Sequence, residues 1–112
     1  MDDELLPSVD AETALSTTGW VLLDVREHDE WIRGRAPQAV HIPMSELTGR
    51  VAELDREHRL VCVCRSGNRS AQVTKWLRSQ GFDAVNMSGG MNAWAAAQQP
   101  VVNEAGNPGI VI

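Results

Sequence analysis

Leu60-Val61-Cys62-Val63-Cys64-Arg65-Ser66-Gly67-Asn68-Arg69-Ser70 is the stretch that decides the fold of this 112-residue chain. Its first four residues are apolar without alternation, which is typical of a strand buried on both faces of a parallel sheet. A short polar loop follows, and a helix is predicted to begin near residue 68. Ligands of open α/β sheets bind beyond the carboxyl ends of the strands. Cys64 stands at such an end and is therefore the first candidate for a functional residue.

Strand-like and helix-like segments alternate on both sides of this stretch. The other predicted strands are residues 20–25, 39–42 and 84–87, with 7–9 as an edge strand. The predicted helices are a short one capped by Asp10 or Thr13, residues 27–32 ended by Gly34, one capped by Ser45 that includes Leu47, Val51 and Leu54, residues 68–80 stopped by Gly81, and residues 90–98. This alternation predicts a three-layer α/β/α domain with a mostly parallel central sheet of about five strands.

The helix of residues 68–80 is the clearest of these segments. We expect Val73, Trp76 and Leu77 to form its buried stripe. The chain length suits one domain, with a core of about residues 9–102 and a C-terminal tail over 103–112.

Composition limits the classes of partner and compartment. The net charge of -5 and the sequence pI near 5.0 argue against a nucleic acid or an anionic membrane as partner. The acidic residues 1–4 do not resemble the start of a signal peptide, and no apolar run approaches the ~20 residues that span a bilayer. With only two cysteines, Cys62 and Cys64, a disulfide framework is not expected. We expect a cytoplasmic protein.

The surroundings predicted for Cys64 favour its thiolate. Backbone N–H groups of residues 65–70 can turn toward the sulfur, and the N-terminus of the following helix adds partial positive charge. Arg65 and Arg69 add full charges, and such surroundings lower the pKa of a cysteine. Gly67 allows the backbone conformations that a tight anion cradle requires.

A cysteine at a junction between a strand and a helix is also often a small core residue. Two arginines placed against the helix dipole, in an acidic protein, favour the alternative that an anion binds there.

The loop Cys64-Arg65-Ser66-Gly67-Asn68-Arg69-Ser70 resembles the C-x-x-G-x-R-S/T pattern of the rhodanese family. The resemblance extends over about residues 9–102. The segment 23–27 is similar to the family's D-V-R-E, the segment 89–94 with Pro100 to its G-G-x-x-A-W ending, and the segment 30–43 to its G-H-I-x-G-A-x-N-I-P region. Arg35 and His41 depart from that last pattern, for which we expect altered surface recognition and unchanged chemistry.

The resemblance implies a two-step sulfur transfer. The Cys64 thiolate takes the outer sulfur of a small donor such as thiosulfate, forming a persulfide, and cyanide or a cellular thiol then removes that sulfur. A protein sulfur acceptor is a further candidate partner. The loop from Arg65 to Ser70, including Ser66, Gly67 and Asn68, would bind substrate and stabilise the persulfide. No cofactor is implied.

Two other functions remain open. One is a rhodanese-fold module that relays sulfur or regulates a partner without turnover, against which the intact Cys64 argues. The other is a relative of the cell-cycle phosphatases and arsenate reductases. Those enzymes carry C-x5-R, whereas Cys64 to Arg69 is C-x4-R, a cradle sized for sulfur.

The remaining candidates have structural interpretations. Cys62 shares a strand face with Cys64 and is expected in the core, with a resolving thiol as the alternative. Asp24 and Arg26 are expected to form a structural ion pair, although Arg26 is a candidate for the rim of the pocket. No zinc site is expected, because the histidines show no ligand spacing.

Overall fold

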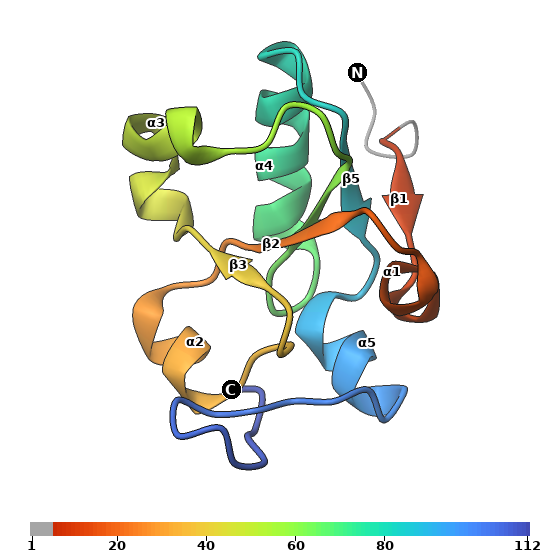
Figure 1. Cartoon of the computed structure of the whole chain (residues 1–112), viewed down its shortest axis with the longest axis vertical. Coiled ribbons are helices and arrows are strands. Elements are labelled where there is room, and N and C mark those ends of the chain that lie inside the picture. Colours follow the sequence, from red (N-terminus) through yellow and green to blue (C-terminus); the bar gives the residue numbers. More distant parts are fainter. Residues whose placement is uncertain (1–5) are drawn as a thin grey trace.

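The computed structural model describes residues 6–112, and its centre is one five-stranded sheet (Figure 1). The strand order is β1-β5-β4-β2-β3, and every neighbouring pair is parallel. The strands are β1 (Ser8–Val9), β2 (Val21–Asp24), β3 (Val40–His41), β4 (Leu60–Val63) and β5 (Ala84–Met87). The predicted α/β fold, with Ser8–Val9 as an edge strand, is confirmed.

Helices cover both faces of the sheet. They are α1 (Ala11–Ser16), α2 (His28–Arg33), α3 (Leu47–Arg50), α4 (Asn68–Ser79) and α5 (Gly90–Ala96), with 3-10 turns η2 (Met44–Glu46) and η3 (Val51–Glu53) around α3. The carboxylate of Asp10 accepts a hydrogen bond from the Thr13 amide at 2.7 Å, so Asp10 is the cap of α1. Gly81, at φ +90°, follows the end of α4 as predicted.

Alternate residues of each strand face opposite layers, because side chains along a strand have a period of two. One face packs against α3 and α4, and the strand residues in that core are Leu23, Leu60, Cys62 and Ala84. The other face packs against α1 and α5, and its strand residues are Leu22, Val61, Val63, Val85 and Met87. Strands buried on both faces explain the absence of polar alternation in β4 and β5.

The prediction of one helix capped by Ser45 is wrong. The segment consists of three short turns, and Ser45 lies inside the first, where its hydroxyl donates to Glu27 Oε1 at 2.9 Å. Gly49 in the middle disfavours a continuous helix, and the carboxylate of Glu27, the residue before α2, gives Ser45 a partner outside its own segment.

Two other predictions need adjustment. Trp76 is only partly buried, whereas the buried face of α4 contains Ser70 and Thr74 beside Val73 and Leu77. The last helix ends at residue 96, two residues earlier than predicted.

Trp31 of α2 contacts Arg35 and His41, the two residues that depart from the family pattern. The His41 ring stacks on it with centroids 4.5 Å apart, and the Arg35 guanidinium lies 4.5 Å from its centroid. Arg35 also pairs with Glu104 of the C-terminal segment at 2.8 Å. These side chains therefore connect α2, β3 and the end of the chain.

Within residues 6–112, no helix is both long and apolar enough to span a membrane. The prediction about a signal peptide concerns residues 1–4, which lie outside the described residues.

Candidate active site

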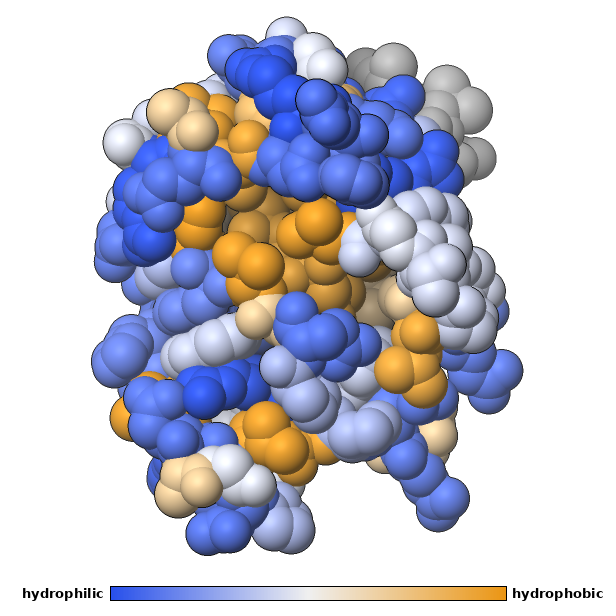
Figure 2. Space-filling view, in the orientation of Figure 1, coloured by the Kyte–Doolittle hydropathy of each residue, from blue (hydrophilic) through white to orange (hydrophobic). Residues whose placement is uncertain are grey.

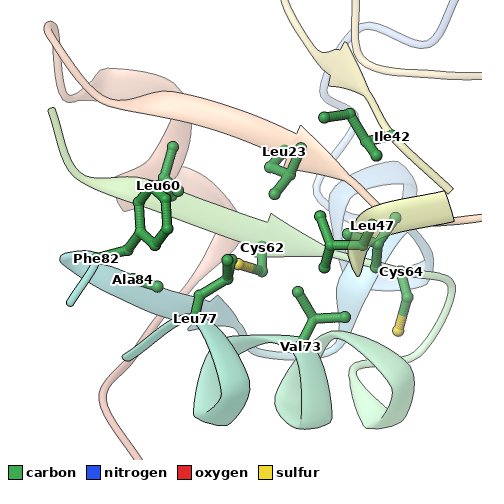
Figure 3. Packing of buried hydrophobic residues seen from close by; sticks show 11 residues of the cluster. Leu23, Ile42, Leu47, Leu60, Cys62, Cys64, Val73, Leu77, Phe82 and Ala84 are labelled. Atoms are coloured by element: carbon green, nitrogen blue, oxygen red, sulfur yellow. The ribbon is translucent and has the colours of Figure 1, made fainter. Parts of the chain in front are cut away.

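Cys64 follows the last residue of β4, the middle strand of the sheet, and is 1 % exposed. Figure 3 shows its sulfur beyond the end of the strand, directed toward the turn that begins α4. Leu47 and Val73 pack in the same cluster. The sulfur thus lies where the carboxyl end of a central parallel strand meets the start of a helix.

The loop surrounds the sulfur with hydrogen-bond donors. The Gly67 amide donates to Sγ at 3.1 Å, and Ser70 Oγ lies 3.3 Å from it. Burial raises the pKa of the Cys64 thiol, but the Ser70 hydroxyl and the amides of Ser70, Gly67 and Ser66 together outweigh burial and lower it. The hydrogen-bond donors of the loop therefore favour the thiolate form of Cys64 relative to an ordinary cysteine.

Gly67 gives the loop its curvature. Its φ of +110° lies in the left-handed region, which residues with a Cβ rarely adopt. The predicted loop residues separate into two groups: Gly67 and Ser70 are buried against the sulfur, whereas Arg65, Ser66 and Asn68 are exposed at the surface.

Arg69 is not a free cation. Its guanidinium donates to both carboxylate oxygens of Glu30, on α2, at 2.8 Å each. This pair raises the pKa of Arg69 and lowers that of Glu30. The positive charge predicted at Arg69 is therefore compensated by Glu30, while the guanidinium of Arg65 bonds to no other residue in the described part of the chain.

Arg26 does not line the rim. It is fully buried, and its guanidinium pairs with Asp24 at 2.8 Å and donates to the Gly34 carbonyl at 2.6 Å. The predicted ion pair is confirmed and the rim position is wrong, because the side chain turns inward to the carboxylate at the end of β2.

The first turn of α5 is hydrogen-bonded to the backbone of the loop at Cys64 and Arg65. The amides of Met91 and Asn92 donate to the carbonyls of Cys64 and Arg65 at 2.8 and 2.9 Å. A Cβ on Gly90 would lie 2.4 Å from the Cys64 carbonyl oxygen, so only glycine permits this approach.

Cys62 lies in the core, as predicted. It is 0 % exposed, and burial raises the pKa of its thiol to about 12. Figure 3 shows it enclosed by the cluster, at a distance from the loop end where Cys64 lies. A thiol in this environment remains protonated and inert at neutral pH.

Asn86 of β5 contacts the loop, although the sequence interpretation did not assign it a role. Its side chain is hydrogen-bonded to Ser70 Oγ at 2.6 Å. The available signal was a single polar residue within the otherwise apolar run 84–87.

An apolar groove lies between α3 and α4, next to the site (Figure 2). It is lined by Met44, Leu47, Thr48, Gln72, Val73 and Trp76. Leu47 and Val73 belong both to this groove and to the cluster around Cys64. Among residues 6–112, no three His, Cys, Asp or Glu side chains are grouped so that they could hold a metal ion.

Residues 9–97 match the model of the rhodanese-like domain, and the chain belongs to this family. It is 47% identical over 79 residues to a Bacillus subtilis protein named "Putative sulfurtransferase YtwF", covering 70% of this chain and 77% of that protein. It is 34% identical to the thiosulfate sulfurtransferase GlpE of Pseudomonas savastanoi pv. phaseolicola, over 74% of this chain and 79% of that one.

The same fold is found in a solved structure. A rhodanese-related protein from Thermoplasma volcanium superposes with a TM-score of 0.82 at 33% identity, covering 88% of this chain and 99% of that one. The relatives' names and the family together support a role in sulfur transfer.

Proposed function

We propose that this protein is a sulfurtransferase in which Cys64 carries sulfane sulfur as a persulfide. The observation that carries the proposal is the position of Cys64 Sγ, 3.1 Å from the Gly67 amide and 3.3 Å from Ser70 Oγ. These donors favour an anionic sulfur without a partner base, which is the requirement for attack on a sulfur donor.

The first step forms the persulfide. The Cys64 thiolate attacks the outer sulfur of a donor such as thiosulfate, and a new S–S bond forms at Sγ. The donor's own S–S bond breaks, and sulfite leaves with its electron pair. The outer persulfide sulfur then carries the negative charge, which the loop amides can stabilise.

The second step returns the thiolate. Cyanide or a thiolate acceptor attacks the outer sulfur, the persulfide bond breaks, and its electron pair returns to Cys64 Sγ. The products are thiocyanate or a new persulfide on the acceptor. Arg65 is the exposed cation of the loop, and we assign it to the attraction of anionic donors.

Mass spectrometry of the intact protein after incubation with thiosulfate tests the assignment. The wild-type protein and Cys62→Ala are expected to gain one sulfur, because Cys62 is buried and protonated. Cys64→Ser is expected to gain none, since a hydroxyl cannot hold sulfane sulfur. Uptake by Cys64→Ser, or its absence in Cys62→Ala, would mean that the nucleophile is assigned incorrectly.

Two turnover assays test the class of reaction. Transfer from thiosulfate to cyanide is expected, and hydrolysis of an aryl phosphate is not, because the C-x4-R loop is short for a tetrahedral phosphate. A persulfide that cyanide cannot discharge would indicate a relay module. Phosphatase turnover without sulfur uptake would refute the proposal.

A further inference from the structure

Asn86 contacts the site from β5, a strand that contributes no residue to the proposed sulfur transfer. It lies in β5, is 8% exposed, and pairs in register with Cys62 of β4. Because Ala84 faces α4 and side chains alternate along a strand, Asn86 faces α4 as well. Its amide therefore meets the first turn of that helix, where Ser70 lies.

The orientation of this amide follows from its two partners. The Gly67 carbonyl, which can only accept, lies 3.3 Å from Asn86 Nδ2. The amide nitrogen must face that carbonyl, and consequently Oδ1 faces Ser70 Oγ at 2.6 Å. A carbonyl oxygen also only accepts, so Ser70 must donate its hydrogen to Asn86 in this arrangement.

Ser70 has one hydroxyl hydrogen and more than one acceptor. Cys64 Sγ and the Gly67 carbonyl oxygen each lie 3.3 Å from Ser70 Oγ, both farther than Asn86 Oδ1. While the hydrogen is bonded to Asn86, the oxygen presents lone pairs to the sulfur. It can then accept a hydrogen bond from a protonated thiol but cannot donate to a thiolate.

We propose that Asn86 is a positioning residue that controls the ionisation of Cys64 by competing with it for the Ser70 hydrogen. In the thiol state Ser70 donates to Asn86 Oδ1 and accepts from the Cys64 S–H. When Sγ loses its proton, the hydroxyl hydrogen turns from Oδ1 to the sulfur anion, and Asn86 loses that bond. Asn86 thus opposes ionisation and keeps the thiolate from being stabilised too strongly.

This role deepens the sulfur transfer proposed above and rests on it. A thiolate becomes a weaker nucleophile as its pKa falls, and the most effective attacking thiol has a pKa near the ambient pH. The loop amides lower the pKa of Cys64, and in this arrangement Asn86 limits that effect. The balance favours ionisation while preserving the nucleophilicity of the sulfur.

The loop does not need Asn86 for its shape. The Gly67 carbonyl also accepts the Ala71 amide of α4 at 3.0 Å, and this helical bond remains when the Asn86 side chain is removed. Substitution therefore frees the Ser70 hydrogen without leaving that carbonyl unpaired. A sulfur anion is a stronger acceptor than a neutral carbonyl, so the hydrogen goes to Cys64.

The charged groups around Cys64 stay constant in this comparison. They are Arg65 in the loop and Arg69 of α4, which interacts electrostatically with Cys64 and also with Glu30 and Glu27. None of them bonds to Asn86.

The experiment measures the pH dependence of Cys64 alkylation by iodoacetamide, with the adduct located by mass spectrometry. Leucine has a branched side chain similar in shape to that of asparagine but no polar atom. In Asn86→Leu the midpoint of the alkylation rate against pH is therefore expected to move to lower pH. The expected change is about fivefold in the ionisation constant, the usual worth of a neutral hydrogen bond such as the Ser70–Asn86 bond that ionisation breaks in the wild type. Asn86→Ala is measured in parallel in case leucine does not fit, and circular dichroism establishes folding.

Two further variants separate this role from a structural one. Ser70→Ala alone should move the midpoint to higher pH, and adding Asn86→Leu to it should have no further effect. Thr74→Val removes a neighbouring buried hydroxyl that donates to the Ser70 carbonyl at 2.7 Å, and should leave the midpoint unchanged.

An unchanged or raised midpoint in the folded Asn86 variants would overturn the proposal, as would a fall that persists without the Ser70 hydroxyl. Alkylation requires no sulfur donor. A protein that ionises as described but takes up no sulfur would therefore refute only the proposed function.

Discussion

At the scale of single residues, Cys62 and Cys64 belong to the same buried cluster, and the pKa values of their thiols shift in opposite directions. Burial dominates at Cys62 and raises its pKa to about 12. At Cys64, donors from the loop outweigh burial and lower the pKa. The sulfur two residues further along the chain has left the strand, where amides are paired in the sheet, and has reached a turn whose amides point toward it.

Because the Cys62 thiol is buried, we expect the folded protein to lose stability at alkaline pH. Its pKa is raised on folding, so its stabilising contribution is complete below the ordinary value of 9.0 and is lost as pH rises toward 12. Compared with Cys62→Val, the wild-type protein should lose about 1.4 kcal/mol of unfolding free energy per pH unit in this window. Urea denaturation at several pH values measures the difference. Parallel curves for the two proteins would contradict the prediction.

At the scale of elements, the loop that follows Cys64 is hydrogen-bonded to α5 as well as joined to the strand and the helix that it connects. The first turn of α5 donates two amides to the carbonyls of Cys64 and Arg65. These carbonyls are thereby turned away from the sulfur, which leaves the amide side of the loop to face it. The Gly89–Gly90 pair, at φ +75° and +57°, is what allows the helix to approach so closely.

Gly90→Ala should therefore displace the loop. Its Cβ would lie 2.4 Å from the Cys64 carbonyl oxygen and 2.6 Å from that of Arg65. Because a misplacement of about 1 Å can reduce a rate on the order of a hundredfold, we expect a loss of that size in persulfide formation. Stopped reactions analysed by mass spectrometry give the rate. Gly49→Ala, at an exposed site with nothing within 4 Å, is the matched control and should keep the wild-type rate.

At the scale of the whole molecule, the C-terminal segment packs against the end of α2, the helix that contains Glu30 (Figure 1). Arg35 and Val102 exchange two backbone hydrogen bonds of 2.9 Å, and the Ile110 amide donates to the Arg33 carbonyl at 3.0 Å. Gly34 lies beneath this crossing, where a Cβ would fall 2.1 Å from the Ile110 carbonyl oxygen.

Gly34→Ala should lift the segment and destabilise the fold by about 1–3 kcal/mol, the usual effect of forcing extra volume into a packed site. Urea denaturation measures the loss, and limited proteolysis should cut the released segment faster than in the wild type. A change in unfolding free energy no larger than that of Gly49→Ala would show that the crossing tolerates a methyl group.

The sequence by itself determined the alternation of strands and helices along the chain, the parallel sheet and the position of Cys64 just after a buried strand. These depend on local patterns: uninterrupted apolar runs of four residues require burial on both faces, and Gly67 marks a turn before a helix. Periodicity also placed Cys62 in the core, because two residues along a strand return to the same face.

Only the tertiary structure decided the partners of the polar groups. Glu30 reaches Arg69 from 39 residues away and Asn86 reaches Ser70 from 16 residues away, and no local pattern encodes either distance. The same holds for the burial of Arg26, whose guanidinium is held by the Gly34 carbonyl in addition to the nearby Asp24 carboxylate. Charge and hydrogen-bond pairing depend on distances of a few ångströms across separate elements, which are fixed only when the layers pack.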